Sequence, residues 1–156
     1  MRESELDREA KEWNLPISRS KTKRPLNVPL TDRMMQLIGP PVEDYIFKAS
    51  SKSGHTTASG AFQSLSRHCE SLGMEAVGTH TLRRTFITNM ARLGVPIEIR
   101  NRLTNHKDPS IDALYNQHDY LQERRTALCK WDRKLTSILE HAEAASTNVI
   151  HIDRVS

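Results

Sequence analysis

The chain has 156 residues, of which 37% are hydrophobic and 27% charged, and its formal net charge is +4 at pH 7. This length and composition fit one soluble globular domain, and the absence of any long apolar run argues against a membrane-spanning protein. Two cysteines, Cys69 and Cys129, lie far apart without metal-ligand spacing, so we expect reduced thiols in a cytoplasmic protein.

The N-terminal part predicts a small antiparallel sheet. Residues 1–11 are rich in charge and predict a short strand and a turn. Segments 13–18 and 26–30 alternate apolar and other residues, which predicts the two strands of a β-hairpin. Segment 45–48 predicts a third strand, and 148–155 predicts an added strand at the end of the chain.

Helical patterns account for most of the remaining chain. The predicted helices cover 31–38, 57–72, 79–93, 96–106, 108–115 and 120–145. Thr31 or Asp32 is expected to cap the first helix, and Thr79 or Thr81 the third. The residues expected to face the core are Phe62, Leu65, Cys69, Leu82, Phe86, Met90, Leu93, Ile99, Leu103, Ala127, Leu128, Trp131, Leu135, Ile138 and Leu139. Together these signals predict an α+β fold that is mainly helical.

Basic residues gather in two stretches. The first contains Arg19, Lys21, Lys23, Arg24 and Arg33, with Asp32 as its one acid. The second contains Arg83, Arg84, Arg92, Arg100, Arg102 and Lys107, with Glu98 as its one acid. Clusters of this kind favour a polyanionic partner.

Four residues near the second cluster suit the chemistry of phosphodiesters. They are His80, Arg83, His106 and Tyr115. Arginine is a permanently charged, planar fork that matches phosphate oxygens in pairs. Histidine donates to an oxyanion or moves a proton near neutral pH, and tyrosine is a covalent nucleophile once it loses its proton. The set therefore indicates attack on a phosphodiester by a tyrosine.

The order and spacing of these residues resemble the signature of the tyrosine recombinases, or phage integrases. The chain reads HTLR at 80–83, LTNH at 103–106, and Tyr115 nine residues after His106. The words HTLRRTF and LGVP resemble the prophage and genomic-island branch. The resemblance implies the mainly helical catalytic domain of that family, with a small antiparallel sheet, and duplex DNA attachment sites as partners.

The resemblance also implies roles for single residues. Tyr115 is the expected nucleophile, with Tyr120 as the alternative. Arg83 and His106 are expected to stabilise the transition state, and His80 to help accept the tyrosine proton. The family carries a catalytic lysine on a hairpin turn, and its spacing from Pro29 selects Lys21 over Lys23. Expected contacts with DNA are Arg19, Lys23, Arg24, Lys52, Arg67 and Arg84; no metal and no small-molecule cofactor is expected.

The chain departs from the family pattern at its start. The family has a first catalytic arginine in a GxRxGE-like turn upstream of the hairpin, and a separate core-binding domain before it. Residues 1–156 resemble one partial catalytic domain that begins after that turn. We therefore expect this chain alone to form phosphotyrosine poorly if at all and not to recombine DNA, whereas the family assembles as a tetramer on DNA.

Two other functions remain possible from the sequence. A DNA-binding remnant of a prophage integrase would keep the fold and the basic residues without catalysis. A type IB topoisomerase uses similar residues, but the LTNH segment and the amino-acid sequence of the hairpin argue against it. The chain also has Asn105 where many integrases have glycine.

Overall fold

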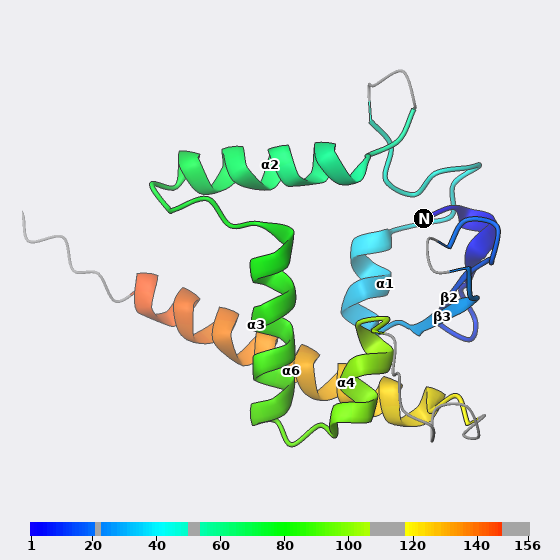
Figure 1. Ribbon diagram of the computed structural model, residues 1–156. Coiled ribbons are helices and arrows are strands. Elements are labelled where there is room, and N and C mark those ends of the chain that lie inside the picture. The colour runs from blue at the N-terminus through cyan, green and yellow to red at the C-terminus, as the bar shows by residue number, and fades with distance from the viewer. Residues whose placement is uncertain (21–22, 50–53, 107–117, 148–156) are drawn as a thin grey trace, which may run out of the picture.

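The computed structural model describes residues 1–20, 23–49, 54–106 and 118–147 (Figure 1). A short 3-10 helix, η1 (Glu3–Glu5), and three strands come first: β1 (Leu6–Asp7), β2 (Glu12–Leu15) and β3 (Leu26–Pro29). The helices that follow are α1 (Asp32–Ile38), α2 (Ala58–Ser71), α3 (Thr79–Arg92), α4 (Ile97–Leu103) and α6 (Leu121–Thr147). The predicted α+β class is confirmed.

The sheet is antiparallel and has the order β1-β2-β3. Trp13 lies opposite Leu6 on one side and Val28 on the other, so the predicted hairpin is confirmed. The turn after β1, in which Lys11 has a φ of 53°, brings the chain back against β1. The first residues of the chain therefore supply the third strand.

The prediction of a strand at 45–48 was wrong. Tyr45 forms one isolated bridge with Arg2, and Lys48 forms another with His55. The hydrogen bonds of this segment go to other loops, with Ile46 N donating to Met1 O at 3.2 Å and Thr56 N to Phe47 O at 2.9 Å. The segment therefore pairs through isolated bridges and does not form a strand of the sheet.

The core lies where α3, α4 and α6 meet. Its fully buried centre is Met90, which is 0% exposed, and Val95, Ile99 and Ala127 surround it. Phe86 and Trp131 pack at its border with their rings edge to face, at a centroid distance of 5.7 Å. The predicted inward positions are confirmed at Phe86, Met90, Ile99, Ala127 and Trp131.

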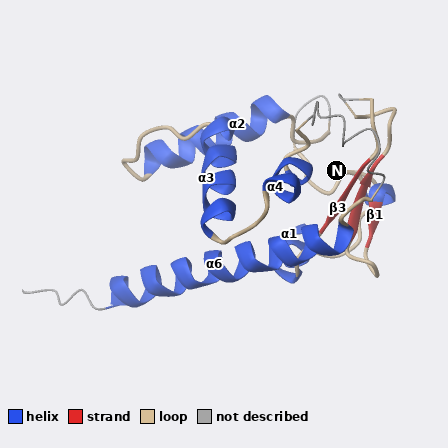
Figure 2. Ribbon diagram, turned by 60° about the horizontal axis from the view of Figure 1, so that its bottom comes forward, coloured by secondary structure: helices blue, strands red, loops and turns tan. Residues whose placement is uncertain are grey.

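Other predicted core residues are exposed. Leu82 is 50% exposed because it lies in the first turn of α3, far along the helix from the crossing with α6 (Figure 1). Ile138 and Leu139 are exposed because α6 continues past the other helices (Figure 2). Phe62 on α2 is also exposed, since α2 lies across the N-terminal end of α3, away from the core.

Helix starts follow the predicted caps in one case and not in the other. Thr31 accepts a hydrogen bond from Met34 N and caps α1. The helix α3 is preceded by Gly78, which supplies no side-chain cap, so neither Thr79 nor Thr81 has the predicted role. The N–H groups at the start of α3 are therefore not capped by the side chain of the preceding residue.

The buried carboxylate of Glu5 holds the N-terminal segment on the sheet. Burial by itself raises the pKa of Glu5, but hydrogen bonds from Arg2 N and Trp13 Nε1 and the charge of Arg19 outweigh it and lower this pKa. A carboxyl group with a lowered folded-state pKa stabilises the fold above its unfolded pKa of about 4.3 and loses that effect as the pH falls through the folded value.

We expect Glu5→Gln to lower the free energy of unfolding near pH 7 by about 1–3 kcal/mol, because a charged hydrogen-bond acceptor is lost. The difference between the two proteins should shrink as the pH falls below about 4. Urea unfolding of both proteins from pH 7 to pH 3 measures this difference. The Arg8 guanidinium also lowers the pKa of Glu3. Glu3 is present in both proteins, so its contribution to the pH dependence cancels in the difference. A difference that is constant with pH would contradict the assignment to Glu5.

Candidate active site

Arg83 of α3 and His106, which follows α4, lie in contact. Arg83 Nη2 is 3.2 Å from His106 Nδ1 and also donates to the main-chain oxygen of Thr104. Thr104 Oγ1 lies 2.9 Å from the same histidine nitrogen and 2.8 Å from Arg100 O. The structure thus brings together two predicted site residues that are 23 positions apart in the sequence.

Thr104 is the residue that organises this pair, and the sequence did not single it out. Its side chain is buried, with only 8% of the residue exposed, whereas Arg83 and His106 are exposed. A buried hydroxyl and carbonyl therefore fix the inner side of the two functional groups, and their outer side is open to solvent. A threonine before an Asn-His pair is too common a pattern to reveal such a role.

The chain reaches His106 through a helix-ending motif. Asn105 has a φ of 51°, in the left-handed region. Asn105 N donates to Arg102 O at 3.2 Å, and His106 N donates to Asn101 O at 2.9 Å. These two bonds are those of a Schellman motif, which usually has glycine and sometimes asparagine at the left-handed position. Asn105 thus adopts the left-handed conformation that glycine usually has at this position.

We expect Asn105→Gly to keep the stability and the position of His106, because glycine adopts the left-handed region without strain. Asn105→Val should lower the free energy of unfolding by about 1–2 kcal/mol, because a β-branched residue is disfavoured there. Thermal unfolding of the two variants and the parent chain tests this. Equal destabilisation by glycine and valine would contradict the motif as the cause.

The remaining predicted site residues on α2 and α3 are exposed. His80 lies in the first turn of α3, three residues before Arg83, and Arg84 follows Arg83 directly. Arg67 lies on α2, where its Nε is 3.3 Å from Gln63 O. All three side chains are accessible to a large partner such as a nucleic acid.

The basic stretch near the hairpin divides into two kinds of residue. Lys23 and Arg24, in the connection between β2 and β3, are exposed. Arg19 forms an ion pair with the buried carboxylate of Glu5, and Arg33 forms one with Asp132 at 2.9 Å. Arg19 and Arg33 therefore have structural partners. Lys21, Lys52 and Tyr115, together with the predicted helix at 108–115 and the predicted strand at 148–155, lie outside the described residues.

Tyr120, the alternative nucleophile, lies just before α6 and packs against the core. The guanidinium of Arg102 lies over its ring at 4.5 Å from the centroid, and the ring of His118 meets it edge on at 4.5 Å. Its φ of 54° is uncommon for a bulky residue. These contacts give Tyr120 a structural role where the chain enters α6.

No group of three or more histidine, cysteine, aspartate or glutamate side chains in the described part of the chain is arranged to hold a metal ion. Among the helices that the structure describes, none combines the length and apolar character needed to cross a membrane.

Comparisons with known proteins give the same family. The sequence profile described as the Phage integrase family matches residues 1–122. The chain is 26% identical to "Prophage integrase IntA" of Escherichia coli (strain K12), over 97% of this chain and 37% of that protein. It is 29% identical to "Probable integrase/recombinase YoeC" of Bacillus subtilis (strain 168), over 65% of this chain and 59% of that protein.

The chain thus spans less than two thirds of the length of either relative. No solved structure matches it significantly. The family profile covers most of the chain, including the strands, α3 and α4. The chain therefore belongs to the phage integrase family.

Proposed function

We propose that this chain is the C-terminal catalytic part of a site-specific recombinase, which cuts and rejoins DNA through a tyrosine. The observation that carries the proposal is the contact between Arg83 and His106 on an open surface, 3.2 Å between nitrogens. Two cationic or hydrogen-bonding groups at this separation can bind neighbouring oxygens of one phosphate. The spacing to Tyr115 supports a nucleophile on the same segment.

In the proposed reaction, the phenolic oxygen of Tyr115 attacks the phosphorus, and its proton passes toward His80. A bond from the tyrosine oxygen to phosphorus forms, and the bond from phosphorus to the 5′-oxygen breaks. Lys21 gives a proton to the leaving 5′-oxygen. Arg83 and His106 donate to the non-bridging oxygens, where negative charge grows in the transition state. The 3′-phosphotyrosyl bond then preserves the energy for rejoining.

The tautomer of His106 decides which of its ring nitrogens can bind phosphate. When Arg83 Nη2 donates to Nδ1, this nitrogen is unprotonated, because the guanidinium has donors only, and the Thr104 hydroxyl can then donate to it as well. In the neutral ring the proton then resides on Nε2, and this N–H is the group that remains to bind a phosphate oxygen. The arrangement suits electrostatic stabilisation rather than proton abstraction by His106.

Covalent capture tests the proposal. A nicked duplex carrying an attachment site traps the intermediate, because the short fragment released by cleavage diffuses away. We expect a covalent adduct between the chain and the 3′-phosphate, detected as a shifted band and located at Tyr115 by mass spectrometry. DNA binding without any adduct would instead identify a catalytically incomplete remnant, which is the second candidate function.

The number of matched arginines limits the expected rate. The family pattern that the sequence resembles has two catalytic arginines, and Arg83 is the one that we assign within residues 1–156. Arg2 instead lies over the ring of Tyr45, and its Nη2 donates to the hydroxyl of that tyrosine at 2.9 Å. Loss of one preorganised donor costs on the order of a hundred- to a thousandfold in rate. We therefore propose that this chain alone forms the adduct slowly and does not complete recombination, which requires a tetramer on DNA.

DNA binding by this chain should be weak, largely independent of sequence and sensitive to salt. The exposed residues Lys23, Arg24, Arg67 and Arg84 supply contacts to phosphates. If these four contacts form, the logarithm of the binding constant should fall with that of the salt concentration with a slope of about −3.6. Fluorescence anisotropy between low and moderate salt measures the slope. An affinity that does not change with salt would contradict binding through phosphates.

A further inference from the structure

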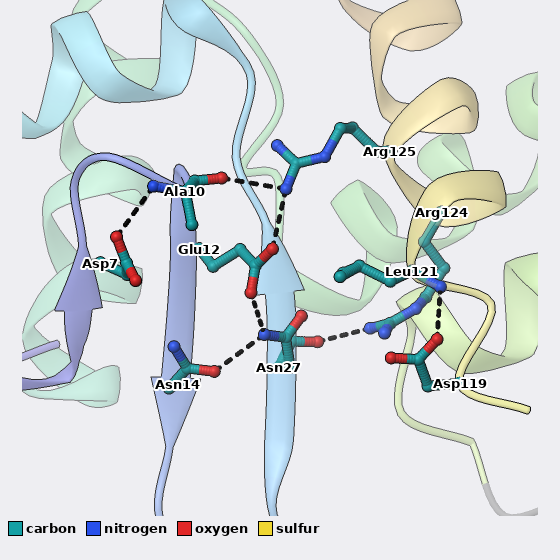
Figure 3. Close-up of polar contacts among 9 residues, drawn as sticks. All are labelled: Asp7, Ala10, Glu12, Asn14, Asn27, Asp119, Leu121, Arg124 and Arg125. Carbon is teal, nitrogen blue, oxygen red and sulfur yellow. Dashed lines mark hydrogen bonds and ion pairs between the residues drawn. The ribbon is translucent and has the colours of Figure 1, made fainter. Parts of the chain in front are cut away.

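The first turns of α6 carry two neighbouring arginines that bind the sheet (Figure 3). Arg125 Nη2 donates to the main-chain oxygen of Ala10 at 3.0 Å and to the carboxylate of Glu12 at 2.9 Å. Arg124 Nη1 donates to the main-chain oxygen of Asn27 in β3. The two arginines thereby hold β2 and β3 against the start of α6.

The side chain of Asn27 connects the same two strands. Its Nδ2 donates to Glu12 at 2.7 Å and to Asn14 at 2.8 Å (Figure 3). A displacement of either arginine would therefore be transmitted to both strands of the hairpin. The network is a direct connection between α6 and the hairpin.

Burial of the Arg124 guanidinium at this junction costs free energy. Only 6% of the residue is exposed, and burial lowers the pKa of its guanidinium, although an arginine stays protonated near neutral pH. Within the part of the chain that the structure describes, Arg124 forms no ion pair, and its buried Nε has no hydrogen-bond partner. Burial of a charged side chain costs free energy unless hydrogen bonds and opposite charges compensate for it. The hydrogen bond to β3 and the nearby charge of Asp119 provide that compensation for Arg124.

The chain order suggests what Arg124 does. Its partner Asn27 lies six residues after Lys21, and Arg124 itself lies nine residues after Tyr115. Arg124 thus joins the strand that follows the proposed general acid to the helix that follows the proposed nucleophile. Geometry at a reacting centre is sensitive to such connections, since a misplacement of about 1 Å can cost on the order of a hundredfold in rate.

We propose that Arg124 is a positioning residue for the leaving-group side of the reaction. It fixes β3, the strand that follows the basic connection, on the first turns of α6, the helix that follows the segment of the nucleophile. This inference rests on the proposed function, in which Lys21 gives a proton to the 5′-oxygen. Arg124 acts through the hairpin and does not touch the DNA.

A substrate with a better leaving group provides the test. When sulfur replaces the bridging 5′-oxygen, the P–S bond breaks and a thiolate leaves without needing a proton, because thiols ionise with a pKa of about 8.5. The released thiolate also rejoins poorly, so the adduct accumulates even when the reaction is slow. The rate of adduct formation on the oxygen and sulfur substrates, measured with an excess of the full chain, separates general-acid catalysis from all other effects.

We expect Arg124→Met to slow adduct formation on the oxygen substrate by about a hundredfold, and on the sulfur substrate by no more than about threefold. Lys21→Ala should show the same pattern. Arg33→Gln is the matched control, since it removes the ion pair of α1 with Asp132 farther along α6; any slowing there should be equal on both substrates. Arg124→Lys keeps the charge without the planar fork and serves if the methionine variant does not fold.

Each outcome decides the question. Equal slowing on both substrates, or no slowing on either, would overturn the role of Arg124 and leave the proposed function standing. No adduct from the unsubstituted chain on either substrate would overturn the proposed reaction, and the role of Arg124 with it.

Discussion

Arg83→Ala should reduce the rate of covalent adduct formation by at least a hundred- to a thousandfold, which is the usual loss for one preorganised donor. The guanidinium binds phosphate oxygens in the proposed reaction and also contacts His106 and Thr104 in the folded protein. The alanine variant therefore lacks the guanidinium donor, and it also lacks the contact that helps to hold the His106 imidazole in place. Single-turnover capture on the sulfur-containing substrate measures the rate.

Two further variants separate chemistry from charge. Arg83→Lys keeps the positive charge but not the planar fork, so it should recover only part of the lost rate. Arg133→Ala removes an exposed arginine from α6 and should leave the rate unchanged. A rate that is equally low for Arg83→Ala and Arg133→Ala would assign the effect to net charge and contradict the site. Thermal unfolding checks that each variant is folded.

Tyr115→Phe should abolish the adduct, because no other atom of that side chain can form the bond to phosphorus. Tyr120→Phe should form it at close to the parent rate, since phenylalanine retains the ring that packs on the core and under Arg102. Denaturing gels of both variants after incubation with the nicked duplex give the result. An adduct that persists in Tyr115→Phe and disappears in Tyr120→Phe would reverse the assignment.

Much of the fold could be predicted because its signals are local. Thr31 caps α1 as its position before the helix suggests, and the hairpin pairs Trp13 with Val28 as the alternation requires. Met90 and Ile99 are buried because helical spacing places them on the inner faces of α3 and α4. Periodicity determines which side of an element is apolar.

Periodicity does not determine how much of that side is covered. Leu82 belongs to the same stripe as Met90, yet it is exposed, because α3 meets α6 only along its C-terminal half. Segment 45–48 has the residues of a strand, but its bridges to Arg2 and His55 are isolated and it does not join the sheet. These results depend on where other elements stop, which no local pattern contains.

The sequence by itself determined the family, the α+β class and the set of candidate residues, because residue types and spacings are properties of the chain. Only the tertiary structure decided which basic residues bind acidic partners: Arg19 pairs with Glu5 and Arg33 with Asp132, while Lys23 and Arg84 face solvent. It also decided that Thr104 joins Arg83 to His106, and that Arg124 joins the hairpin to α6. Contacts of this kind form between segments far apart in the chain, and their geometry is fixed only when the intervening elements pack.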